Sequence, residues 1–185
     1  MPQRPKPIDF NAIRKAISNT VEKYVGGKLK CIQAEQSDQN RPSPPMPYMT
    51  FKIIAAAMKS GDDHQSYITD ETWSRSGQRV MTVSFQCFAA QQEEAYEIMS
   101  LWQAQLELNT VQEYLRRSKI AVWLIGGVAD LTQLHNTGYE ARSQMDVTFG
   151  IASNLDEDLG SIETVGVEGE VDTDQEIIEV NFDAP

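Results

Sequence analysis

The 185-residue sequence has no long apolar run and few cysteines, and each shortage excludes a class of protein. No apolar run approaches the roughly 18 residues that a membrane-spanning helix needs. The basic residues in MPQRPKPIDF are not followed by the apolar stretch of a signal peptide. Two cysteines, Cys31 and Cys87, are too few for a disulfide framework or a zinc quartet, and they indicate synthesis in a reducing, cytoplasmic compartment.

Motifs of common enzymes are also missing: the sequence has no P-loop, no G-x-S-x-G and no H-E-x-x-H. His64 and His135 are the only histidines, and neither has an acid–base partner that the sequence identifies. Asp62, Asp63 and His64 leave a small metal-dependent cytoplasmic hydrolase as a remote alternative, although a solvated turn is the commoner role of such a group. From these residues we expect that the protein is not an enzyme. We expect no catalytic residue, no metal ligand and no cofactor.

Positive charge is absent from the end of the chain. All 16 Lys and Arg residues lie at or before Arg142, whereas residues 154–185 hold 11 acids and no base, which accounts for the net charge of −11. We predict a folded domain over residues 1–168 and an acidic tail over residues 169–185. The asymmetry is compatible with self-association and equally with a solvated tail, and an acidic chain of this layout is a poor general nucleic-acid binder.

Helical periodicity appears in three places. Asp9 is placed as an N-cap before a helix that ends at Gly26-Gly27 and has apolar residues at three- and four-residue spacing. A second helix is expected from Gln91 to Leu108, followed by a short one that ends at Arg116-Arg117. The apolar stripes expected to face the core are Phe10, Ile13, Ile17, Val21 and Tyr24 in the first helix and Ala95, Ile98, Met99, Trp102 and Leu106 in the second.

Strands are indicated by period-two alternation of apolar and polar residues, in which the odd-numbered residues are apolar. Ala121 to Val128 is instead apolar on both faces, which favours a central strand. The other expected strands are Leu29–Gln33, Tyr48–Ala57, Met81–Ala89, Tyr139–Ile151 and Ile162–Val167. The sequence thus predicts one α+β domain with a mixed or antiparallel sheet packed with helices.

Two projecting segments are expected outside this body. The proline-rich stretch Gln36 to Pro47 reads as an exposed loop, and turn-forming residues at 60–63 and 74–77 bracket a hairpin arm over His64–Trp73. Exposed apolar residues in such segments suit contact with a partner. The candidate contacts are Trp73, in the arm, and Ile177, Ile178, Val180 and Phe182, in the acidic tail.

Several segments, in order, resemble proteins of the phage neck or tail terminator family. After the N-terminal helix come RPSPPMPYMTFKI, GQRVMTVSFQCFA with AYEIMSLWQAQL, TVQEYLRRSKIAVWLIGGVADLTQL and GYEARSQMDVTFGIAS. The resemblance covers about residues 8 to 168, and its specificity lies in the order and combination of these segments.

The resemblance implies a virion structural protein, assembled in the host cytoplasm, that forms a hexameric ring on the last ring of the tail tube. Its expected partners are copies of itself, the tail tube protein, the tail sheath of a contractile-tailed phage, and neck or head-completion proteins. DNA would only pass through the lumen of the ring. Another neck or tail-tube protein of the same fold is the alternative within this class.

Overall fold

The structure is a computed structural model that describes residues 8–26, 29–34, 43–69, 72–135 and 138–158. Three helices and seven strands make up this described part of the chain. The helices are α1 (Phe10–Tyr24), α2 (Gln92–Glu107) and α3 (Asn109–Arg116). The strands are β1 (Lys30–Gln33), β2 (Tyr48–Thr69), β3 (Thr72–Ala89), β4 (Ile120–Ile125), β5 (Ala129–Asp130), β6 (Gln133–His135) and β7 (Gly138–Asp158).

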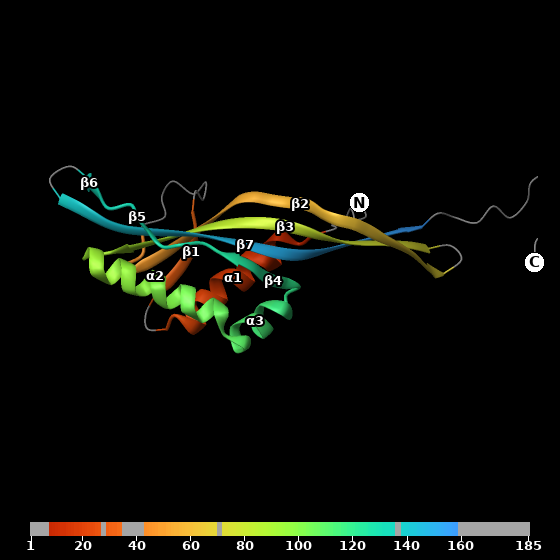
Figure 1. The fold of residues 1–185 in the computed structure, drawn as a ribbon, viewed down its shortest axis with the longest axis horizontal. Helices are drawn as coiled ribbons and strands as arrows, with labels where there is room; N and C mark the ends of the chain where they lie inside the picture. Colours follow the sequence, from red (N-terminus) through yellow and green to blue (C-terminus); the bar gives the residue numbers. More distant parts are fainter. Residues whose placement is uncertain (1–7, 27–28, 35–42, 70–71, 136–137, 159–185) are drawn as a thin grey trace, which may run out of the picture.

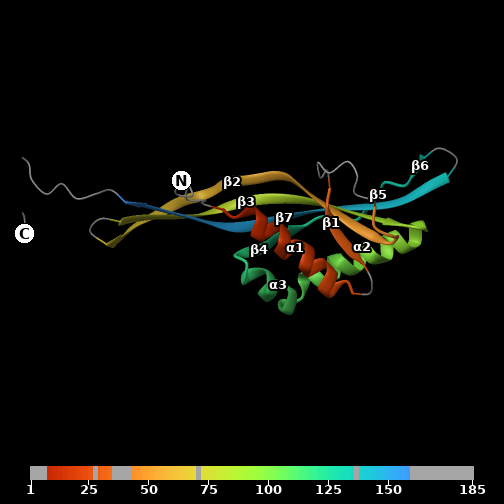
Figure 2. The same ribbon diagram turned by 180° about the vertical axis from the view of Figure 1, so that it is seen from behind.

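The strands form a mixed sheet in the order β1-β2-β3-β7-β4, and β5 and β6 also pair with β7 (Figure 1). Strand β1 runs parallel to β2, and the other neighbours are antiparallel. The three helices lie together on one side of the sheet in both views (Figures 1 and 2). The prediction of a single α+β domain with a mixed sheet packed with helices is confirmed.

The core lies between the helices and the odd-numbered residues of the long strands, as the alternation predicts. Met81, Val83 and Phe85 of β3 are fully buried beside Val147 and Phe149 of β7. From the helix layer, the buried stripe Ala95, Met99, Trp102 and Leu106 of α2 packs toward the same face. The edge of the Trp102 ring meets Phe85 at a centroid distance of 5.6 Å, a favourable aromatic arrangement.

Helix α1 begins as the sequence indicates. The Asp9 carboxylate accepts hydrogen bonds from the backbone amides of Asn11 and Ala12, at 3.0 and 3.1 Å. These bonds satisfy amides that have no partner inside the helix. Two hydrogen bonds connect α1 to β1. The Ser18 hydroxyl donates one to the Cys31 carbonyl, and the Glu22 carboxylate accepts one from the Cys31 backbone amide.

The expectation of a central strand over Ala121–Val128 is wrong. Among the described strands, β4 pairs only with β7 and forms the end of the sheet order. Its apolar residues divide instead between two roles: Ile120 is buried in the core, whereas Trp123 and Leu124 are 45% and 66% exposed. The register shifts between Val122 and Leu124, so that the chain bulges at Trp123.

The turns expected at 60–63 and 74–77 are also wrong. Strands β2 and β3 are each continuous through these residues, and the turn-like residues Gly61, Asp62 and Asp63 lie in a bulge between the pairs Ser60–Gln78 and His64–Ser76. Pairing with β3 on both sides of the bulge keeps β2 extended, and residues 74–77 of β3 pair with β7 as well. The strands therefore continue where local preference favours a turn. The projecting segment is therefore longer than a hairpin over 64–73, and β7 adds a third strand to it.

Three smaller expectations have mixed outcomes. His135 ends strand β6, and the sequence did not indicate β5 or β6. The described residues of the proline-rich stretch, 43–47, contain no helix or strand, as expected. The last strand expected, Ile162–Val167, lies outside the described residues.

Candidate functional site

The feature that distinguishes this fold is a three-stranded arm, which we define as Met58–Thr69 of β2, Thr72–Val80 of β3 and Ala152–Asp158 of β7. These segments pair with one another, apart from the bulge at residues 61–63 of β2, and run on beyond the three helices (Figures 1 and 2). The core cluster stops at Met81 and Ile151, just before the arm begins. The arm is thus built mainly by strand pairing, without the helix layer that covers the rest of the sheet.

Register assigns the side chains of the arm to its two faces. Residues directly opposite one another in a sheet share a face, and every second residue of a strand returns to it. Ile151 is in the core and pairs with Arg79, which pairs with Lys59. The same face then carries the triples Leu155–Arg75–Gln65 and Glu157–Trp73–Tyr67, and we call it the helix-side face of the arm.

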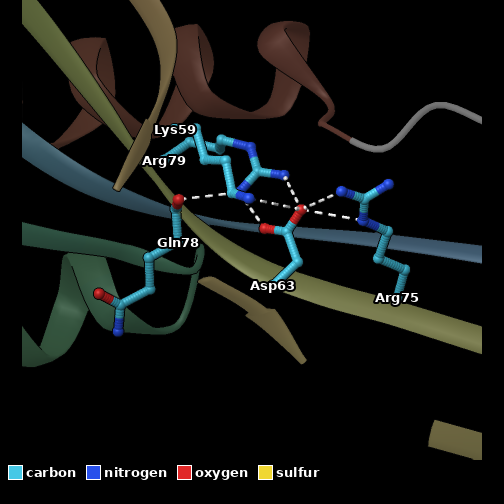
Figure 3. A network of polar contacts seen from close by, with 5 residues as sticks. All are labelled: Lys59, Asp63, Arg75, Gln78 and Arg79. Atoms are coloured by element: carbon cyan, nitrogen blue, oxygen red, sulfur yellow. Dashed lines mark hydrogen bonds and ion pairs between the residues drawn. The ribbon is translucent and has the colours of Figure 1, made fainter. Parts of the chain in front are cut away.

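A cluster of charged side chains, shown in Figure 3, lies at the start of this face next to Ile151. Asp63 is at its centre, and its side chain is only 3% exposed. Arg79 donates from Nη1 to Asp63 Oδ1 at 2.6 Å and from Nη2 to Oδ2 at 3.1 Å. Arg75 donates to Asp63 Oδ2 from Nε and Nη2 at 2.9 and 2.7 Å, and Lys59 Nζ is 3.9 Å from the same oxygen.

The bulge and one glycine make this cluster possible. Asp63 leaves the regular register on the bulged part of β2 and lies over Gly77 of β3. A Cβ atom at Gly77 would collide with Asp63 Oδ1 and crowd Arg79 Nη1, so a larger residue there would displace the carboxylate. Arg75 and Arg79, two residues to either side of Gly77, then reach the carboxylate from both directions.

The hydrogen bonds from Arg79, followed by those from Arg75 and the charge of Lys59, lower the pKa of Asp63 to about 2, against the opposing effect of desolvation. The bond to Asp63 likewise raises the pKa of Arg79. Both shifts favour the charged forms of Asp63 and Arg79, and three basic side chains surround this single acid. The cluster leaves the helix-side face cationic next to the core.

Apolar groups lie further out on the same face. The rings of Tyr67 and Trp73 pack with centroids 4.2 Å apart, and Tyr67 is 66% exposed. A hollow of about 340 Å³ opens beside them, lined by Gln65, Trp73, Arg75, Leu155 and Glu157. Trp73, predicted to contact a partner, is thus placed at the outer end of an exposed surface that combines apolar and cationic groups.

The opposite face of the sheet, which no described helix covers, is polar in its middle. A hollow of about 320 Å³ there is lined by Ala34, Thr50, Lys52, Ile54, Ser84, Gln86, Arg142 and Gln144. Among the described residues, Ser84 Oγ and Arg142 Nε are buried without a hydrogen-bond partner. The Arg142 guanidinium also lies over the Phe88 ring, 5.2 Å from its centroid.

The other candidate groups do not assemble into a reaction centre. Asp63 is occupied by arginines and is not part of the solvated turn expected at 62–64, while His64 is exposed. No group of three possible metal ligands occurs within the described ranges. Burial raises the pKa of the Cys87 thiol to about 12 and that of Cys31 still further, which keeps both sulfurs protonated. Ile177, Ile178, Val180 and Phe182 lie outside the described residues.

Sequence reasoning missed the Asp63 cluster because Arg75 and Arg79 lie 12 and 16 residues after Asp63 and reach it only across paired strands. A signal was nonetheless present: Arg75 and Arg79 flank Gly77 at alternate positions, and an acid occurs in the preceding strand. Alternate positions share one face, so two bases around a glycine indicate a space that an acid can fill.

Comparison with known protein families identifies a match over most of the chain. The family model described as phage neck terminator protein matches residues 11–176, which is most of the chain and includes all three strands of the arm. No curated protein matches the sequence. Within the described residues, none of the helices is long and apolar enough to cross a membrane.

Proposed function

Because the chain belongs to the phage neck terminator protein family, and is therefore a structural component of the virion neck, we propose that it forms a hexameric ring that closes the head-proximal end of the tail. The match over residues 11–176 is the observation that carries this proposal. The ring stacks on the last ring of the tail tube, next to the sheath of a contractile tail, and offers its other side to the head-completion proteins. Assembly takes place in the host cytoplasm, and DNA passes through the lumen.

The surface of the isolated chain supports a role in assembly. Tyr67, Leu155, Trp123 and Leu124 are large apolar side chains that remain exposed on the arm and on the edge strand β4. Clusters of exposed apolar residues commonly mark protein–protein contacts. In a closed ring each interface joins two different surfaces of the protomer, so a chain needs several such areas.

The ring is tested by the mass of the purified protein in solution and by electron microscopy. We expect about 125 kDa, six copies of the 20.8 kDa chain, and ring-shaped particles with a central opening. A single-chain mass at every concentration tested would contradict the ring.

Termination is tested separately, by adding the protein to growing tubes of the tail tube protein from the same phage. We expect shorter tubes that carry one extra ring at one end. Tubes of unchanged length, or binding along the whole tube, would show that the protein is a neck or tube component with another position.

A further inference from the structure

The helix-side face of the arm continues a surface that binds helices elsewhere in the same molecule. In the body of the sheet, the odd-numbered residues of β3 and β7 pack against α2. Past Met81 and Ile151 the same face continues along three strands, and no described helix lies on it. The arm thus presents a helix-binding face without a helix.

The chemistry of that face is cationic at its base and apolar toward its tip. Lys59, Arg75 and Arg79 outnumber the acids Asp63 and Glu157. Tyr67, Trp73 and Leu155 supply the apolar part, beside a hollow of about 340 Å³. A complementary partner would be a helix with exposed acids and a few exposed apolar residues.

Helix α2 has these properties on the side that faces away from the core. It contains no lysine or arginine, and Glu93, Glu97 and Glu107 are exposed. Leu101 is 42% exposed on the side of α2 away from the buried stripe, and Leu108, the residue that ends the helix, is 49% exposed. A leucine on the solvent side of a helix that already buries a complete stripe requires an explanation other than the core.

We propose that the helix-side face of the arm in one copy of the chain docks on the outer face of α2 in the next copy. The arm and α2 lie toward opposite ends of the molecule in both views, so the contact joins two copies (Figures 1 and 2). Their lengths match: seven residues of β7 beyond Ile151 span about 23 Å at about 3.3 Å each, and the 16 residues of α2 span about 24 Å.

This contact deepens the proposed ring and rests on it. It is heterologous, because the arm of each copy meets a different surface of its neighbour, and repetition can close a ring. The apolar part of the contact consists of Trp73 and Leu155 on the arm of one copy. They pack against Leu101 and Leu108 of the next copy. The charges orient the two surfaces and speed their encounter, since exposed ion pairs add little to affinity.

Disulfide cross-linking tests the geometry. We pair Leu155→Cys with Leu101→Cys in one chain; the native Cys31 and Cys87 are buried and do not compete. Under mild oxidation we expect a ladder of cross-linked chains on a denaturing, non-reducing gel. The matched control pairs Asn154→Cys with Leu101→Cys, because Asn154 is exposed on the opposite face of the arm, and we expect no ladder from it.

A charge change tests the same contact without cysteine. Glu97→Lys should raise several-fold the protein concentration at which half of the chains are assembled. Glu113→Lys makes the same charge change at an exposed residue of α3 and should leave that concentration unchanged. Circular dichroism of both variants shows whether the fold is retained.

The outcomes separate this contact from the ring itself. A multi-copy mass with no ladder, or with equal ladders from both cysteine pairs, would overturn the arm–α2 contact and leave the ring proposal standing. A single-chain mass for the unmodified protein would overturn both. A ladder from the Leu155 pair alone, together with a selective effect of Glu97→Lys, supports the contact.

Discussion

Phe149 shows how much a single inward residue contributes to this fold. Its side chain is fully buried and its ring lies edge-on to Phe85, with centroids 6.5 Å apart. Phe149→Ala should lower the free energy of unfolding by about 3–5 kcal/mol, because it removes a large buried ring and leaves a cavity. Urea denaturation measures the loss.

Thr148→Ala is the matched control, since Thr148 points to the other face of the same strand and is not part of the core. We expect a loss below about 1 kcal/mol for this variant. Equal losses for the two substitutions would mean that the inward face has been assigned wrongly.

Asp63 makes the stability of the arm depend on pH in the acidic range. Its pKa is about 2 in the folded chain, mainly through the bonds from Arg79, against a usual value of 3.8. A lowered folded pKa gives stability that is fully present above pH 4 and lost as the pH falls through 2. The difference in urea midpoint between the native chain and Asp63→Asn should therefore be constant above pH 5 and shrink between pH 4 and pH 2.

Gly77→Ala provides a second measurement on the same cluster. The added methyl collides with the Asp63 carboxylate, so it should destabilise the native chain and be better tolerated when Asp63 is also changed to Ala. Additive effects of the two substitutions would show that they do not share a contact.

At the scale of elements, local sequence predicted what faces the core and failed where pairing overrides local preference. The stripes of α1 and α2 face the core as their periodicity indicated, although Phe10, Tyr24 and Ile98 are only partly buried. The odd-numbered residues from 81 to 89 in β3 and from 141 to 151 in β7 are buried. Gly61 and Asp62 favour a turn in isolation, yet β2 passes through them as a bulge, because its residues on both sides of the bulge pair with β3. Strand β4 looked central because Trp123, which lies over Gly150, made its second face apolar.

The candidate site was less accessible to sequence reasoning than the core. The sequence predicts Trp73 as a contact residue in a hairpin arm, and the structure places it in the arm, half-buried against Tyr67. The charged cluster beside it depends on a bulge that sets the position of Asp63, and no local pattern specifies that register. The role of Trp73 in contact with a partner stays a prediction.

The arm should open more readily than the body of the sheet when the chain is not assembled. None of its residues belongs to the core cluster, and few apolar contacts resist opening. Amide hydrogen exchange should be faster in residues 58–69 and 152–158 than in residues 81–89 and 143–151 of the isolated chain. In assembled particles the arm should become protected, and equal protection in both states would show that the arm makes no contact there.

At the scale of the whole molecule, charge is divided between a near-neutral body and an acidic end. Residues 168–185 hold seven acids and no base, together with Ile177, Ile178, Val180 and Phe182. Such composition resists burial in the chain's own core, while its apolar residues suit the open edge of a partner's sheet. We therefore propose that residues 169–185 form a tail that binds a neighbouring tail or neck protein.

Deleting residues 169–185 should leave rings intact in solution and weaken their joining to the rest of the particle. The apolar residues should dominate this binding, and the acids should set its salt dependence, because exposed ion pairs contribute only about 0–1 kcal/mol each. Replacing Ile177, Ile178 and Phe182 by serine keeps every charge and should weaken joining nearly as much as the deletion. Joining is measured by complementation of a phage that lacks the protein, and ring formation by mass in solution. Loss of rings would assign the tail to the interface between copies, and unchanged joining would show that the tail is a solvated segment.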